Sequence, residues 1–362
     1  MSRKDVIRDN LIGIPFKSTI VKYDYYLEGV IDVNVGTEGF VEELITLKDG
    51  RIVTFSSDET IRIISKTQIL EVENKVNSYQ DVTVLPDGNI ALIGDYNIVQ
   101  IINPDEGKTI FIFQGHKNYV FQLFVLEYED SYSIMSLDGT DLLIWDPYTG
   151  KIINELKGNG YSPIVKLSND RIAIGNGPNI EIINLNTHQV DFILKGDPEK
   201  RVFPIYLSSN GKLLTTYVGG YIKVKIWDLN TQEGFEHPLN YSPGNNIRLV
   251  NDEYLIDLDN NGKLMFRNIN TGICDFEYQG EKDVFYGGIL ILPDGRIAIP
   301  LNGQILIFNT DELPKGNCIR IEPELILDAL YPHLYIDLLP DGRIVSASSD
   351  SDEEHKELFI WK

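Results

Sequence analysis

The chain has 362 residues, 43% of them hydrophobic, and a formal net charge of −22 at pH 7. A surface this acidic repels phosphate groups, so we expect it to bind neither nucleic acid nor anionic membranes. No stretch approaches the roughly 20 apolar residues of a membrane span. The first residues mix acidic and basic side chains with no apolar run behind them, which is not the pattern of a secretory signal.

The chain begins with two segments that match nothing later in the sequence. Residues 1–17 are expected to form a tail or a short docking helix, because the apolar residues of 2–12 fall near one helical face. Residues 19–27 are rich in β-formers. We expect residues 18–362 to form a single domain, which begins with this second segment.

From residue 41 onward a short apolar segment, a turn and a second β-rich segment recur along the chain. In the clearest copies the turn is Asp-Gly, which tolerates the backbone of a tight hairpin; these copies are 47–53, 85–91, 292–298 and 339–345. Weaker copies lie at 127–130, 168–171, 209–212 and 251–253. About eight hairpins result, spaced roughly 40 residues apart, which is the period of a four-stranded propeller blade.

A third strand follows each hairpin, and in all but the last repeat a polar turn and a fourth strand come next. The last repeat reaches only its third strand, at 358–361, so we expect residues 19–27 to supply the missing outer strand and close the ring. Closure removes the sheet edges that would otherwise aggregate. The predicted fold is all-β: a β-propeller of four-stranded antiparallel blades, with eight blades favoured and seven as the alternative.

One repeat resembles the WD-repeat family in full. Gly115-His116, Ser136 to Thr140 and Trp145-Asp146 stand where that family has its characteristic residues. The resemblance implies that His116, the turn residue Asp138 and Trp145 share a hydrogen-bonded network inside one blade. A Trp recurs in this column at Trp227 and Trp361, but other repeats have drifted to Ile64, Ile102, Ile183, Arg267 and Phe308.

The family resemblance also implies a non-catalytic scaffold or adaptor that binds a protein or peptide on one propeller face. Aligning the first strands gives a column just inside that face, which is rich in residues typical of binding hot spots. We predict that partner contacts come from Tyr79, Tyr119, Tyr161, Arg201, Tyr286 and His333. The alternative is that the tyrosines pack between blades. The acidic run at 350–354 could receive a basic peptide or form a solvated loop.

No cofactor, metal or catalytic centre is predicted, and we expect the protein not to be an enzyme. The histidines lack the spacing of metal ligands, and residues 257–262, which resemble the opening of a calcium loop, are followed by Asn268 where a closing Glu belongs. Two other functions stay open. One is a propeller hydrolase or lyase that uses Arg201, Tyr286 and His333 at the channel mouth; the other is a structural component of a larger assembly.

The chain has two cysteines, Cys274 and Cys318, which are too few for a disulfide framework. Both are expected in the outermost strands of neighbouring repeats, where a bridge between them is one alternative. Two reduced thiols in a cytosolic protein is the favoured interpretation. We therefore expect a cytoplasmic protein.

Overall fold

The computed structural model describes most of the chain. The described residues are 27–32, 41–56, 58–72, 81–94, 97–157, 164–208, 210–218, 224–237, 247–250, 253–258, 263–280, 289–301, 303–310, 316, 318–328, 334–348 and 357–362. Strands are the only long regular elements in these residues. They group into eight sheets, numbered here as blades 1 to 8, and the sheets divide between two units.

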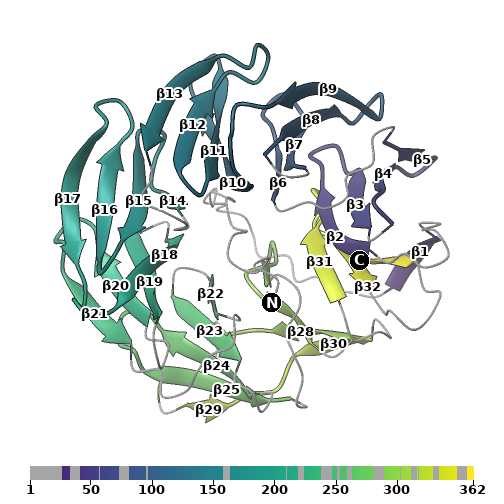
Figure 1. Cartoon of the computed structure of the whole chain (residues 1–362). Coiled ribbons are helices and arrows are strands. Elements are labelled where there is room, and N and C mark those ends of the chain that lie inside the picture. The colour runs from purple at the N-terminus through teal and green to yellow at the C-terminus, as the bar shows by residue number, and fades with distance from the viewer. Residues whose placement is uncertain are drawn as a thin grey trace. The chain divides into compact units, whose positions relative to one another are not determined.

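The first unit holds blades 2 to 5, in which four strands follow one another in chain order and pair antiparallel (Figure 1). Blades 2 and 3 are built from β6 (Val82–Val84), β7 (Ile90–Ile93), β8 (Val99–Asn103), β9 (Lys108–Phe113), β10 (Val120–Glu127), β11 (Tyr132–Asp138), β12 (Asp141–Trp145) and β13 (Ile152–Lys157). Blades 4 and 5 are built from β14 (Ile164–Lys166), β15 (Arg171–Asn176), β16 (Asn179–Asn184), β17 (Gln189–Lys195), β18 (Arg201–Leu207), β19 (Lys212–Val218), β20 (Val224–Asp228) and β21 (Gly234–His237).

The second unit holds blades 1, 6, 7 and 8. Blades 1 and 6 are built from β2 (Val41–Thr46), β3 (Ile52–Ser56), β4 (Ile61–Ile64), β5 (Ile69–Glu71), β22 (Ile247–Val250), β23 (Tyr254–Leu258), β24 (Lys263–Asn268) and β25 (Cys274–Gln279), with β29 (Ile319–Arg320) added to blade 6. Blades 7 and 8 are built from β26 (Leu290–Ile291), β27 (Ile297–Leu301), β28 (Gln304–Phe308), β30 (Leu325–Asp328), β31 (Leu334–Leu338), β32 (Ile344–Ser348), β33 (Glu357–Trp361) and β1 (Leu27–Asp32).

The sequence pattern explains where each strand lies in its blade. Strand β7 reads as a continuous apolar run and β12 does so after Asp141; both are buried throughout, as expected when both faces of a sheet are covered. The fourth strand β9 instead alternates exposed and covered residues from Lys108 to Ile112. The predicted class is confirmed: the fold is an eight-bladed β-propeller of antiparallel blades.

The Asp-Gly turns behave as their residues require. The glycines adopt φ values of 87° to 89°, which a side chain would disfavour; they are Gly50, Gly88, Gly295 and Gly342. The Asp of each turn accepts a hydrogen bond from the backbone N–H two residues later, as Asp49 does from Arg51 at 3.0 Å. These contacts fix the corner between the first and second strands of a blade.

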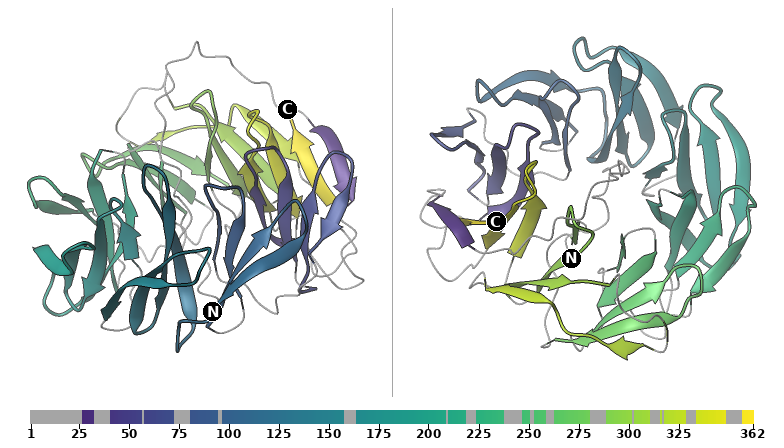
Figure 2. Two further views of the ribbon diagram at one scale, coloured as in Figure 1. Left: turned by 90° about the horizontal axis from the view of Figure 1, so that it is seen from above. Right: turned by 180° about the vertical axis from the view of Figure 1, so that it is seen from behind.

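The N-terminal strand completes the last blade, as predicted. β1 pairs antiparallel with β33, from Leu27 opposite Trp361 to Asp32 opposite Glu357, and lies beside the last blade in Figure 2. The strand that pairs is Leu27–Asp32, which shares only Leu27 with the predicted segment 19–27, and residues 1–26 lie outside the described residues. Blade 8 is also bonded to blade 1, since the backbone N–H of Thr46 donates to Asp337 at 2.8 Å.

Blade 6 departs from the four-strand pattern. The connection between β28 and β30 runs back to the neighbouring blade, where β29 pairs parallel with β25. This path brings Cys318 beside Cys274, and the two form a disulfide bond. The interpretation of the cysteines as two reduced thiols is therefore wrong in this structure, because the position of Cys318 depends on a long connection that is not part of the repeat.

Candidate functional site

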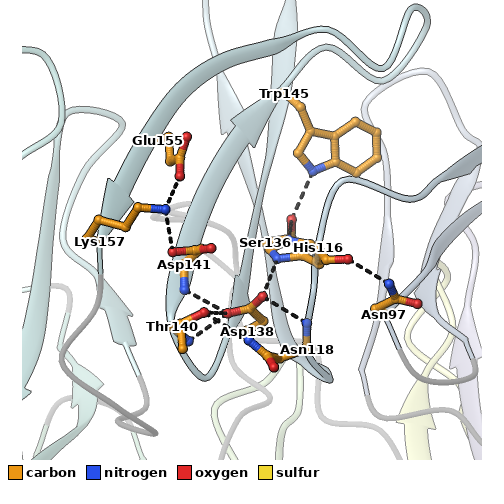
Figure 3. Close-up of polar contacts among 10 residues, drawn as sticks. All are labelled: Asn97, His116, Asn118, Ser136, Asp138, Thr140, Asp141, Trp145, Glu155 and Lys157. Atoms are coloured by element: carbon orange, nitrogen blue, oxygen red, sulfur yellow. Dashed lines mark hydrogen bonds and ion pairs between the residues drawn. The ribbon is translucent and has the colours of Figure 1, made fainter.

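The clearest candidate site is the loop that leads into blade 3, residues 114–119 between β9 and β10. The side chain of its residue His116 is wholly buried and contacts Ser136 and Asp138 of β11 (Figure 3). The Trp145 indole N–H donates to Ser136 Oγ at 2.9 Å, Ser136 Oγ lies 2.6 Å from His116 Nε2, and His116 Nδ1 lies 3.2 Å from Asp138. The hydrogen-bonded network implied by the WD resemblance is therefore present in blade 3.

The hydrogen-bond geometry around His116 fits a neutral histidine. Ser136 Oγ accepts from Trp145, so its own hydrogen can go to His116 Nε2, and Nδ1–H then donates to Asp138. A neutral imidazole satisfies every group. Burial lowers the pKa of His116, against the hydrogen bond and charge of Asp138, which act to raise it.

Asp138 carries the negative charge of this network. Burial acts to raise its pKa, but backbone hydrogen bonds from Thr140 and Asp141, together with side-chain bonds from Thr140 and His116, outweigh burial. The pKa of Asp138 falls to about 2 as a result. It is therefore an ionised carboxylate at neutral pH whose oxygens are committed to neighbours inside the blade.

Ser136, His116 and Asp138 stand in the order of a nucleophilic triad, yet their surroundings are those of a structural network. Ser136 is wholly buried and its hydroxyl already bonds Trp145 and His116. A nucleophile needs an open side on which a substrate can sit within reach of the hydroxyl. This serine has no such side, so the three residues hold the blade together.

The same network fixes the loop in which Tyr119 lies. Asn118 donates through its backbone N–H to Asp138 at 3.3 Å and through its side chain to Thr140 Oγ1 at 2.9 Å. From blade 2, the Asn97 side chain donates to the carbonyl of His116 at 2.6 Å (Figure 3). Tyr119 follows directly and is 59% exposed. The blade thus presents an aromatic side chain on a loop that is bonded on two sides.

Arg201 is the other predicted contact residue that the structure describes. It is exposed and is the first residue of β18, the first strand of blade 5. Tyr119 has a similar place, since it directly precedes β10, the first strand of blade 3. The neighbouring Lys200 forms an ion pair with Asp197 at 2.9 Å. This local basic charge is therefore partly offset.

The remaining predicted contact residues lie outside the described residues. They are Tyr79, Tyr161, Tyr286 and His333. The acidic run at 350–354 and residues 259–262 of the calcium-like segment lie outside them too. The predicted column of tyrosines around one face therefore stays a prediction, with Tyr119 and Arg201 as its described members.

Sequence reasoning missed the two asparagines that anchor the loop. The sequence gives a weak indication of the role of Asn118, since this residue follows His116 by two positions and can reach the turn after Asp138. It gives none for Asn97, because Asn97 belongs to another blade.

A second missed cluster lies at the other end of blade 3, where the hydroxyls of Tyr132 and Tyr148 donate to Asp87 at 2.9 and 3.1 Å. Burial raises the pKa of Tyr132.

No metal or membrane element is found in the part of the chain that the structure describes. Within it, no three His, Cys, Asp or Glu side chains gather as a metal site would require. Nor does that part contain a helix with the length and apolar character needed to cross a membrane.

Comparison with known proteins supports the fold. No protein-family model and no curated protein matches the sequence. Among solved structures, the C-terminal WD40 domain of Sif2 has a TM-score of 0.63 at 13% identity, with 93% of this chain and 99% of that one covered. The WD40 propeller of Doa1 has a TM-score of 0.51 at 15% identity, covering 93% and 97%. BamB from Moraxella catarrhalis has a TM-score of 0.65 at 13% identity, covering 94% and 98%. At the level of fold, this chain is therefore similar to the WD40 β-propellers.

Proposed function

We propose that this protein is a non-catalytic scaffold or adaptor that binds a protein or peptide at the end of blade 3 formed by residues 114–119 and the turn after Asp138. WD40 propellers commonly serve in this way, and the observation that carries the proposal here is the anchored loop before Tyr119. Its neighbour Asn118 bonds Asp138 and Thr140, while Tyr119 is 59% exposed.

An anchored, exposed tyrosine suits a binding hot spot for physical reasons. Tyrosine offers a large apolar area with one polar hydroxyl and has few rotatable bonds to restrict. Because the hydrogen bonds of Asn118 and His116 already hold the loop, little backbone freedom is lost when a partner binds. The net charge of −22 would steer a basic partner to the protein at low salt.

The test compares two exposed tyrosines at opposite ends of one blade. Partners are recovered by affinity capture with the wild type, and their dissociation constants are then measured for Tyr119→Ala and Tyr128→Ala. Tyr128 is 50% exposed in the turn between β10 and β11, so it matches Tyr119 in residue type and exposure. We expect Tyr119→Ala to weaken binding by about tenfold or more and Tyr128→Ala to leave it nearly unchanged.

Thermal unfolding of both variants controls for misfolding, because both side chains are exposed and their loss should leave stability within about 0.5 kcal/mol of the wild type. If both substitutions leave every partner bound, the binding site is not at this end of the blade. Turnover in a screen of glycan and ester substrates, abolished by Arg201→Ala, would instead favour the propeller-hydrolase alternative.

A further inference from the structure

One connection in the propeller is much longer than its counterparts and is covalently fixed. Between the third and fourth strands, blades 1, 2 and 4 need only residues 65–68, 104–107 and 185–188. In blade 7 the same connection, from β28 to β30, spans residues 309–324 and contributes β29 to the neighbouring blade 6.

β29 is held on the edge of β25 by a short set of contacts. The two strands pair parallel through Phe276 with Ile319 and Glu277 with Arg320. The Cys318 N–H donates to the carbonyl of Cys274 at 2.7 Å, and the Ile321 N–H donates to that of Glu277 at 2.8 Å. The disulfide joins Cys318 to Cys274. Along this edge, β29 covers backbone groups that would otherwise face solvent.

One apolar side chain of the docked segment is buried. Ile321 is 6% exposed and packs in a core cluster with Phe276 of blade 6 and Phe308 of blade 7. Arg320 and Glu322 on either side of it are exposed. The described contacts that dock residues 318–322 are the two-residue pairing with β25, the N–H bonds of Cys318 and Ile321, and the buried side chain of Ile321. So short a set of contacts offsets little of the entropy lost in ordering the segment, and the disulfide adds a covalent tie to it.

We propose that the Cys274–Cys318 disulfide is a redox-controlled latch that keeps residues 318–322 on the edge of β25, and that its reduction releases them. In the reduced protein the segment leaves the sheet. The edge of β25 then presents unpaired N–H and C=O groups, which is the arrangement that accepts an added strand.

The reduction is a two-electron exchange with a dithiol. Cys318 is partly exposed while Cys274 is buried, so a thiolate of the dithiol attacks the sulfur of Cys318. The S–S bond breaks, and Cys274 leaves as a thiolate that takes up a proton. The second thiol of the reductant then attacks the mixed disulfide, closes its own disulfide and releases Cys318 as a thiol.

Hydrogen exchange of the whole protein, with and without dithiothreitol, tests the latch. In the oxidised protein the amides of Cys318 and Ile321 should be protected, since both donate within the structure. On reduction we expect peptides that cover 318–321 to exchange at least about tenfold faster. Peptides from β13, whose blade contains no cysteine, serve as the internal control and should not change.

A Cys274→Ser, Cys318→Ser double variant should reproduce the fast exchange without reductant. Should that variant fail to fold, limited trypsin digestion of the wild type gives the same information. Cleavage after the exposed Arg320 is expected to be fast only when the protein is reduced. Two results would overturn the latch: alkylation under non-reducing conditions that finds two free thiols, or equal exchange and equal cleavage in the oxidised and reduced protein.

Discussion

Blades 3 and 1 have the same strand register but different interiors. Val120 pairs with Asp138 in blade 3 as Val41 pairs with Ser56 in blade 1. Counting along the ladders matches Ser136, Asp138 and Trp145 of blade 3 with Thr54, Ser56 and Ile64 of blade 1. The comparison shows that a blade keeps its geometry through strand pairing and apolar packing without the histidine–serine–tryptophan network of blade 3.

Blade 1 has buried hydroxyls at the positions of the blade 3 network. Thr54 Oγ1 and Ser56 Oγ are buried and have no hydrogen-bond partner among the described residues. Ile64, in the tryptophan position, cannot donate to them. Two other blades keep the tryptophan and its acceptor: Trp227 donates to Thr215 at 3.0 Å and Trp361 donates to Ser346 at 2.9 Å. Blade 1 therefore has a buried hydroxyl at this position, but not the indole that donates to the corresponding hydroxyl in blades 5 and 8.

The largest expected effect comes from removing the centre of the blade 3 network. Asp138→Ala leaves the buried His116 Nδ1–H and the backbone N–H groups of Thr140 and Asp141 without their acceptor. We expect the free energy of unfolding to fall by about 3–5 kcal/mol, measured by urea denaturation.

The matched control for this variant is Ser56→Ala at the equivalent position of blade 1. Because the Ser56 hydroxyl bonds none of the described residues, its removal should change stability by less than about 1 kcal/mol. A similar loss of stability in both variants would show that the network contributes nothing beyond the packing of the strands.

Acid should act on the same network, in two steps. The pKa of Asp138 falls from 3.8 to about 2 on folding, so its contribution is present above pH 3.8 and is lost as the pH falls toward 2. This shift in pKa corresponds to a contribution of about 2 kcal/mol to the free energy of unfolding. The pKa of His116 is lowered below 6.5 by burial, so protonation favours the unfolded chain and stability starts to decline below pH 6.5.

Chemical denaturation at a series of pH values from 7 down to about 2 measures both steps. The difference between the wild type and His116→Asn isolates the histidine, because the other four histidines titrate equally in both proteins. An unchanged pH profile in the variant would mean that His116 titrates normally and that its buried, neutral state is wrong.

The repeat pattern predicted the blades because each Asp-Gly turn and each tryptophan position acts locally. Gly50 and Gly342 adopt the positive φ that the turn requires, and Trp145 bonds within its own blade. The position of residues 318–322 could not be predicted in this way, since it depends on Ile321 reaching an apolar cluster that includes Phe276 of blade 6. For the candidate site, the alignment of the first strands identified Tyr119, but nothing in the sequence indicated the support from Asn97.

The disulfide also bears on where the protein works. Thiols stay reduced in the cytosol and disulfides persist in oxidising compartments. A bond that closes a 44-residue separation is expected to contribute about 2–4 kcal/mol. The cytoplasmic location that composition suggested stays a proposal. If it holds, the latch between Cys274 and Cys318 would be open for most of the protein's life.

The smallest expected effect is also the sharpest test of the comparison between blades, because one substitution should act with opposite sign in two of them. Thr54→Val keeps the shape of the side chain and removes a buried hydroxyl without a described partner, so we expect a stabilisation of about 1 kcal/mol. Thr215→Val, at the equivalent position of blade 5, removes the acceptor of the Trp227 indole and should cost about 1–2 kcal/mol. Urea midpoints at constant m-value measure both. If Thr54→Val destabilises the protein as Thr215→Val does, then an internal water bonds the Thr54 hydroxyl, and blade 1 retains a hydrated form of the network.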